Sequence, residues 1–135
     1  MMNRPVLDHI GIAVNDIDAA LELYRDKLGF EVGAIDEVPG FGVKVAFLPL
    51  GEGQVELVMP VTEDSAIAKF LDKRGPGFHH LCFRVDDIRA ELARLEEMGI
   101  ELVDKEPREG AHGTLVAFLH PKSTGGVLIE LAQKS

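Results

Sequence analysis

Apolar residues along the chain first alternate as in a strand and then recur at helical spacing. This order of spacings occurs twice. The stretches at 6–14 and 78–85 alternate as strands do, and each leads to an aspartate, Asp16 or Asp87, suited to capping a helix. The residues after each aspartate recur at helical spacing. They predict one buried stripe per helix, formed by Ile17, Ala20, Leu21, Tyr24 and Leu28 in the first and by Ile88, Leu92, Leu95 and Gly99 in the second.

Three shorter apolar stretches follow each predicted helix, separated by turns rich in glycine and proline. These predicted strands are 30–35, 43–50 and 54–59 in the first half, and 101–104, 114–120 and 127–132 in the second. The pattern predicts an α+β fold in one domain. Two βαβββ modules, 5–60 and 77–133, form paired curved mixed sheets around a cleft with the helices outside, and a short helix and Gly-Pro-Gly linker at 61–76 joins them.

The two halves align with each other as an internal repeat. The offset from His9 to His80 aligns LDHIGIAVNDIDAAL with FHHLCFRVDDIRAEL, and it aligns VAFL at 45–48 with VAFL at 116–119. A short insertion in the second half then brings Glu130 onto Glu56. Because the matches are collinear over both halves, we interpret the chain as a duplication.

Strand alternation predicts where the repeated polar residues point. Side chains alternate across a strand, so His9 and His80 face away from the apolar residues that pack under the helices, as do Glu56 and Glu130. Two imidazoles and two carboxylates suit a divalent transition-metal ion, which we take as the leading interpretation. The alternative is a pair of histidines hydrogen-bonded to the glutamates without a metal.

Composition narrows the function classes. At 135 residues with 46% hydrophobic content, the chain is long enough for one core, and no apolar run reaches the roughly 18 residues of a membrane span. A net charge of −9 argues against nucleic-acid or anionic-membrane partners. The single Cys82 excludes an intramolecular disulfide, and the first residues lack the features of a secretory signal. We therefore expect a cytoplasmic protein.

A repeat with a histidine opening each half and a glutamate closing it resembles the vicinal oxygen chelate superfamily. Within it, GVKVAFLPLGEGQVELVMP and especially GAHGTLVAFLHPKSTGGVLIEL are similar to the methylmalonyl-CoA epimerases, and the resemblance covers essentially the whole chain. The resemblance implies a homodimeric isomerase that interconverts (2R)- and (2S)-methylmalonyl-CoA by removing and returning the C2 proton through an enolate. It also implies a divalent metal, Co²⁺ in the first place or Mn²⁺, Ni²⁺ or Zn²⁺, bound by His9, Glu56, His80 and Glu130.

The resemblance implies Glu130 as one acid/base group. In some members the second is a glutamate on the third strand, but that position corresponds to Val45, which cannot carry a proton. We assign the second acid/base role to Glu56, with a metal-bound water as the alternative. Some epimerases carry Gln at the position of Glu56. The anionic CoA substrate requires local basic residues, and the candidate substrate contacts are Lys122, Arg108 and His112.

Two other functions remain open from the sequence. A glyoxalase I-like lyase acting on a glutathione hemithioacetal would use the same fold and metal, although the HPKSTGG segment favours the epimerases. A metal-free protein that sequesters a ligand would need an apolar, aromatic cleft. The chain has no Trp, one Tyr and seven Phe, and it offers charged side chains instead.

Overall fold

The computed structural model describes residues 4–134, which form two compact units. The first unit runs from His9 to His79, and the second combines residues 4–8 with residues 80–134. Strands β1 and β5 each cross a boundary between the units. The two units are described separately below.

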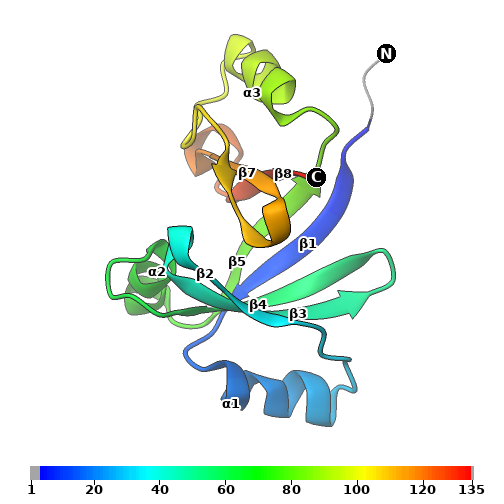
Figure 1. The fold of residues 1–135 in the computed structure, drawn as a ribbon. Coiled ribbons are helices and arrows are strands. Elements are labelled where there is room, and N and C mark those ends of the chain that lie inside the picture. Colours follow the sequence, from blue (N-terminus) through cyan, green and yellow to red (C-terminus); the bar gives the residue numbers. More distant parts are fainter. Residues whose placement is uncertain (1–3, 135) are drawn as a thin grey trace. The chain divides into compact units, whose positions relative to one another are not determined.

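In the first unit the strands form a mixed arrangement with one helix against it. The elements are β1 (Val6–Ala13), α1 (Ile17–Leu21), β2 (Ile35–Val38), β3 (Val43–Leu50), β4 (Gly53–Pro60) and α2 (Ala66–Arg74). Strand β3 pairs antiparallel with β2 and β4, whereas β1 pairs parallel with β4. Figure 1 shows α1 and its continuation on one side of β3 and β4.

The second unit repeats this order of elements. They are β5 (Gly77–Arg84), α3 (Ile88–Glu97), β6 (Arg108–Glu109), β7 (Leu115–Leu119) and β8 (Ile129–Gln133). Strand β7 pairs antiparallel with β6 and β8, and β5 pairs parallel with β8. The predicted fold class, α+β with two βαβββ modules and mixed strand pairing, is confirmed.

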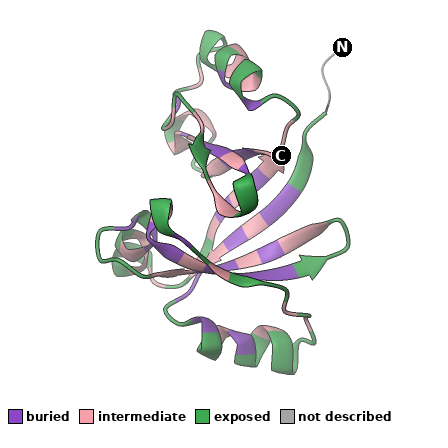
Figure 2. Cartoon of the chain, in the orientation of Figure 1, coloured by how far each residue is buried: buried purple, intermediate pink, exposed green. Residues whose placement is uncertain are grey.

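Each unit has its own hydrophobic core between helix and strands. In the first unit the buried cluster is Val14, Ile17, Leu21, Ala46, Leu48, Val55 and Leu57. In the second it is Ile88, Leu92, Leu102, Ala117, Leu119 and Leu131. Figure 2 shows buried residues along β3 and β4 and exposed residues on the outward side of α1. These cores occupy the helical face of the strands, which leaves the opposite face for the polar residues.

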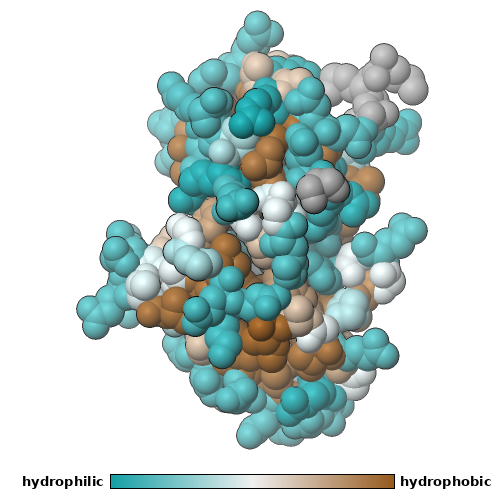
Figure 3. Space-filling view, viewed as in Figure 1, coloured by the Kyte–Doolittle hydropathy of each residue, from teal (hydrophilic) through white to brown (hydrophobic). Residues whose placement is uncertain are grey.

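The helix termini match the sequence pattern. The carboxylates of Asp16 and Asp87 accept hydrogen bonds of 3.1 Å from the amides of Ala19 and Ala90. Such caps satisfy amides that have no partner within the helix. Figure 3 shows hydrophilic side chains over the surface where Figure 1 places α3, as expected for an amphipathic helix.

Leu28 was expected in the buried stripe of the first helix, and this prediction is wrong. After Leu21 the helix continues as a π-helix, η1 (Glu22–Lys27), in which the Leu28 amide donates to the Leu23 carbonyl at 2.8 Å. The wider turn breaks the 3.6-residue spacing on which the prediction rested. Leu28 is therefore 55% exposed.

The predicted strands 30–35 and 101–104 are also wrong in extent. The first ladder begins only at Ile35, because the Gly33 amide reaches the Phe47 carbonyl at 2.7 Å outside regular pairing. In the second half a single bridge joins Leu102 and Leu119. There the Asp104 carboxylate takes the hydrogen bond of the Phe118 amide at 2.9 Å, so a side chain replaces the strand partner.

Among residues 4–134, no helix is long and apolar enough to cross a membrane.

Candidate active site

In the first unit, His9 on β1 and Glu56 on β4 form a buried pair. The Nδ1 atom of His9 lies 3.0 Å from Oε2 of Glu56, and the two side chains are 7% and 13% exposed. The register explains the contact, because Gly11 pairs with Glu56 and His9 lies two residues earlier on the same side of β1. Gln54, the register partner of His9, donates its side-chain amide to the same Oε2 atom at 2.9 Å.

In the second unit, His80 on β5 and Glu130 on β8 form the equivalent pair. The Nε2 atom of His80 lies 3.1 Å from Oε1 of Glu130, and the side chains are 7% and 9% exposed. Here Cys82 pairs with Glu130, and His80 again lies two residues earlier on the parallel strand. The same register in both units places each imidazole beside its carboxylate.

A phenylalanine completes each pair. Phe47 on β3 is the register partner of Glu56, and Phe118 on β7 is the register partner of Glu130. The ring of Phe118 meets the His80 ring edge to face, with 5.7 Å between the centroids. These two phenylalanines were not identified as site residues from the sequence. The signal was present, because both lie in the repeated VAFL segment.

The donor set of the two pairs fits a divalent cation. Imidazole and carboxylate are ligands that divalent transition-metal ions accept, and burying a carboxylate without a compensating charge is costly. The chain thus offers groups able to hold a metal ion, and His9, His80 and Glu130 are among them. This coarser part of the cofactor prediction is confirmed. The identity of the ion stays a prediction.

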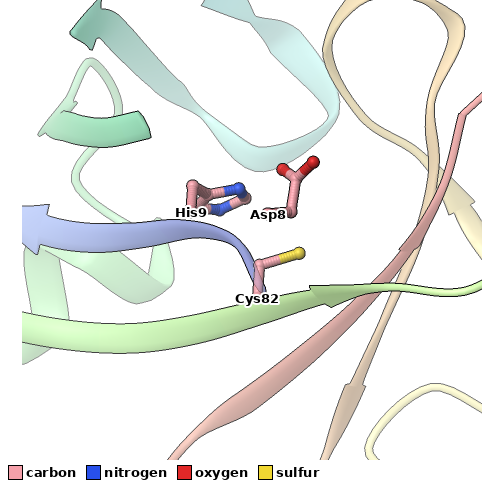
Figure 4. Close-up of side chains that lie close together, drawn as sticks. All are labelled: Asp8, His9 and Cys82. Atoms are coloured by element: carbon pink, nitrogen blue, oxygen red, sulfur yellow. The ribbon is translucent and has the colours of Figure 1, made fainter. Parts of the chain in front are cut away.

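Asp8, the residue before His9 on β1, is a buried carboxylate that is only 5% exposed. Its Oδ1 atom lies 3.7 Å from Arg84 Nη1 and 3.4 Å from Lys134 Nζ, so two cations compensate the buried carboxylate. Figure 4 shows Asp8 and His9 with the thiol of Cys82, a residue that is fully buried.

The candidate substrate contacts lie in the second unit, on the short strand β6 and in two short helical turns. Lys122 is 68% exposed and its Nζ lies 2.9 Å from Oε1 of Glu101. This hydrogen bond is the main cause that lowers the pKa of Glu101 below its ordinary value. Arg108 begins the short strand β6, with its Nε 3.3 Å from Oδ1 of Asp104. Each basic group therefore has a carboxylate partner and stays accessible to solvent.

His112 lies in the turn Ala111–Gly113 between β6 and β7. It is exposed, and its φ of 56° places it in the left-handed region. Residues other than glycine adopt this region infrequently, so the turn holds the His112 backbone in an unusual conformation. The sequence gave no sign of this conformation.

Comparisons with known proteins identify the family of this chain. Residues 8–118 match the family described as Glyoxalase/Bleomycin resistance protein/Dioxygenase superfamily. An ethylmalonyl-CoA/methylmalonyl-CoA epimerase of Cereibacter sphaeroides is 47% identical over 94% of this chain and 96% of its own length. The mitochondrial methylmalonyl-CoA epimerase of Homo sapiens is 44% identical over 94% of this chain and 73% of its own length.

A solved structure extends the likeness to the fold. A methylmalonyl-CoA epimerase in complex with methylmalonyl-CoA and NH4+ has a TM-score of 0.93 and 39% identity, covering 98% of this chain and 96% of that one. The agreement spans both modules that the sequence predicted. The chain belongs to the glyoxalase/bleomycin resistance protein/dioxygenase superfamily and, within it, to the methylmalonyl-CoA epimerase family.

Proposed function

We propose that the chain interconverts (2R)- and (2S)-methylmalonyl-CoA by removing the C2 proton and returning it to the opposite face. The observation that carries this function is the matched pair of buried imidazole and carboxylate groups, His9 with Glu56 and His80 with Glu130. It is supported by a relative of the same fold that was solved with methylmalonyl-CoA.

The residues proposed to hold the divalent cation are His9, Glu56, His80 and Glu130, and Co²⁺ is the ion we infer. When bound, such an ion supplies Lewis-acid stabilisation of the negative charge that develops on the thioester oxygen. Both units contribute one imidazole and one carboxylate through the same strand register. The duplication therefore explains why each unit supplies the same two types of ligand.

The proton transfers require an acid/base group for each face of the planar enolate. We assign one to Glu130, whose carboxylate is buried beside the His80 ring. The second is assigned to Glu56, because Val45 on β3 has no group that can carry a proton. In one direction one carboxylate would accept the C2 proton while the other, already protonated, would donate its proton to the opposite face. In the reverse direction the two roles would be exchanged.

The anionic CoA portion would be bound by Lys122, Arg108 and His112, all in the second unit. Lys122 and Arg108 retain exposed side chains, 68% and 48%, although each also contacts a carboxylate. Phosphate groups carry more charge than those carboxylates, so they can compete for the same cations. We further infer a cytoplasmic location, since a single cysteine is usual in a reducing compartment, and a homodimer, which the resemblance to the epimerase family implies.

The decisive experiment is exchange at C2. Incubating the protein with methylmalonyl-CoA in deuterated water should incorporate deuterium at C2, and metal analysis should find about one divalent ion per chain. A lyase would instead consume the hemithioacetal of methylglyoxal and glutathione. Hemithioacetal turnover without C2 exchange would refute the proposed function, and exchange in thoroughly metal-free protein would refute the role of the ion.

A further inference from the structure

The first carboxylate has a hydrogen-bond donor beside it on the same strand. Gln54 and Glu56 are two residues apart on β4, so their side chains project from the same face. The Gln54 amide donates to Oε2 of Glu56 at 2.9 Å, and His9 Nδ1 contacts that same oxygen at 3.0 Å. Two neighbours thus engage one oxygen of Glu56, while the other oxygen, Oε1, takes part in neither contact.

The second half differs at the equivalent position. Leu128 lies two residues before Glu130, and a leucine side chain has no hydrogen-bond donor. The two halves otherwise agree closely: each has a histidine two residues before the register partner of the glutamate, and a phenylalanine paired with the glutamate across the strands. The amide of Gln54 is thus a local difference between two sites that are alike in register.

We propose that Gln54 is a positioning residue that fixes the orientation of the Glu56 carboxylate for cation binding. This inference rests on the proposed function, because it assumes that Glu56 is a ligand. The hydrogen bond from Gln54 restricts rotation of the carboxylate and directs Oε1 away from the Gln54 amide. A ligand held in its bound orientation loses less conformational freedom when the cation arrives, so the affinity is higher.

The difference between the halves concerns the residue two positions before each glutamate on its own strand. Glu56 is tethered on one oxygen by an amide from its own strand. Leu128 offers no such tether to Glu130, whose contact with His80 involves Oε1 at 3.1 Å. We therefore expect substitutions of Gln54 to change the affinity for the cation before any other property.

The test measures cation binding by the full-length, metal-free protein. Isothermal titration with Co²⁺ should show about 10-fold weaker binding for Gln54→Leu, which places the second-half side chain in the first half. Gln54→Asn should lose about as much, because its amide is one methylene shorter and falls short of Oε2.

Two further measurements separate positioning from a general structural role. Thermal unfolding of the metal-free variants should match the parent, since Gln54 is only partly buried. In a Glu56→Ala background, Gln54→Leu should cause no additional loss of Co²⁺ affinity, because Gln54 acts only through Glu56.

Parent-like Co²⁺ affinity in both Gln54→Leu and Gln54→Asn would overturn the proposal, as would an equal loss in the Glu56→Ala background. A parent protein that fails to bind Co²⁺ or to exchange the C2 hydrogen would instead overturn the proposed function. The two failures are therefore distinguishable in the same set of experiments.

Discussion

Glu130→Gln is the substitution that tests the proposed chemistry most directly. Glutamine has nearly the same shape as glutamate and keeps an oxygen donor, but it cannot accept and return a proton at neutral pH. Because the Glu130 side chain is only 9% exposed and lies 3.1 Å from His80 Nε2, the substitution leaves no cavity and preserves the contact between the strands. The change therefore isolates proton transfer from packing.

The size of the effect follows from the assigned role. A positioned acid or base contributes about 100-fold to 10,000-fold in rate, which corresponds to roughly 3–5 kcal/mol of transition-state stabilisation. We expect kcat for epimerisation and the rate of C2 hydrogen exchange to fall together by at least about 100-fold. Some Co²⁺ binding should remain, because the amide oxygen can still act as a ligand. Removing that oxygen with Glu130→Ala should lose both the activity and the bound ion.

The assay follows C2 deuterium incorporation by mass spectrometry alongside a coupled measurement of epimerisation. Glu91→Gln is the matched control, because Glu91 pairs with Arg94 on helix α3, at 2.7 Å from its Nη2. Substituting this helix residue should change the rate by no more than about 2-fold. A Glu130→Gln protein that folds, binds Co²⁺ and exchanges the C2 hydrogen at the parent rate would remove Glu130 from the mechanism.

Three further predictions address binding, stability and assembly. Lys122→Met should raise the pKa of Glu101 towards its ordinary value in an NMR titration; the stabilisation from this pair is present above the ordinary carboxyl pKa and is lost as pH falls through the lowered value. The same variant should raise KM for the CoA ester by several-fold, and an unchanged KM would exclude Lys122 from CoA binding. Leu57→Ala should lower the free energy of unfolding by about 2–5 kcal/mol in urea titrations, since Leu57 is 0% exposed in the first core. Light scattering at micromolar concentration should give the mass of a dimer, and a monomer mass would contradict the inferred assembly.

The sequence predicted the repeated order of elements because local signals agreed with one another. Alternation located β1 and β5, and the aspartates at the helix starts form the expected caps. Parity along a strand was sufficient to place His9 with Glu56, since one register shift would have turned these side chains to opposite faces. Patterns with a fixed geometric period therefore carried most of the fold and the core of the candidate site.

Features that depend on departures from regular geometry could not be predicted in this way. The π-helical turn that exposes Leu28 involves no proline or glycine within Glu22–Lys27, so the sequence gave no sign of the altered spacing. The compensation of Asp8 by Lys134 joins residues from opposite ends of the chain, which no local pattern reveals. By contrast, the tether from Gln54 could have been found, because a polar residue two positions from a proposed ligand shares its strand face.

The chain has a net charge of −9, yet its proposed substrate is an anionic CoA ester. The two halves of the chain differ in charge at equivalent positions, which offers an explanation. The offset that superimposes His9 on His80 also superimposes Glu37 on Arg108, so the charge is reversed at equivalent positions of the second strand. The insertion that carries Lys122 has no counterpart in the first half, where a turn with Glu52 joins β3 to β4. Like charges within about 8 Å repel at physiological salt, so Glu37 and Glu52 in the first half would disfavour phosphate groups. We therefore expect the segments that differ between the halves, with Arg108 and Lys122, to confine CoA binding to the second half.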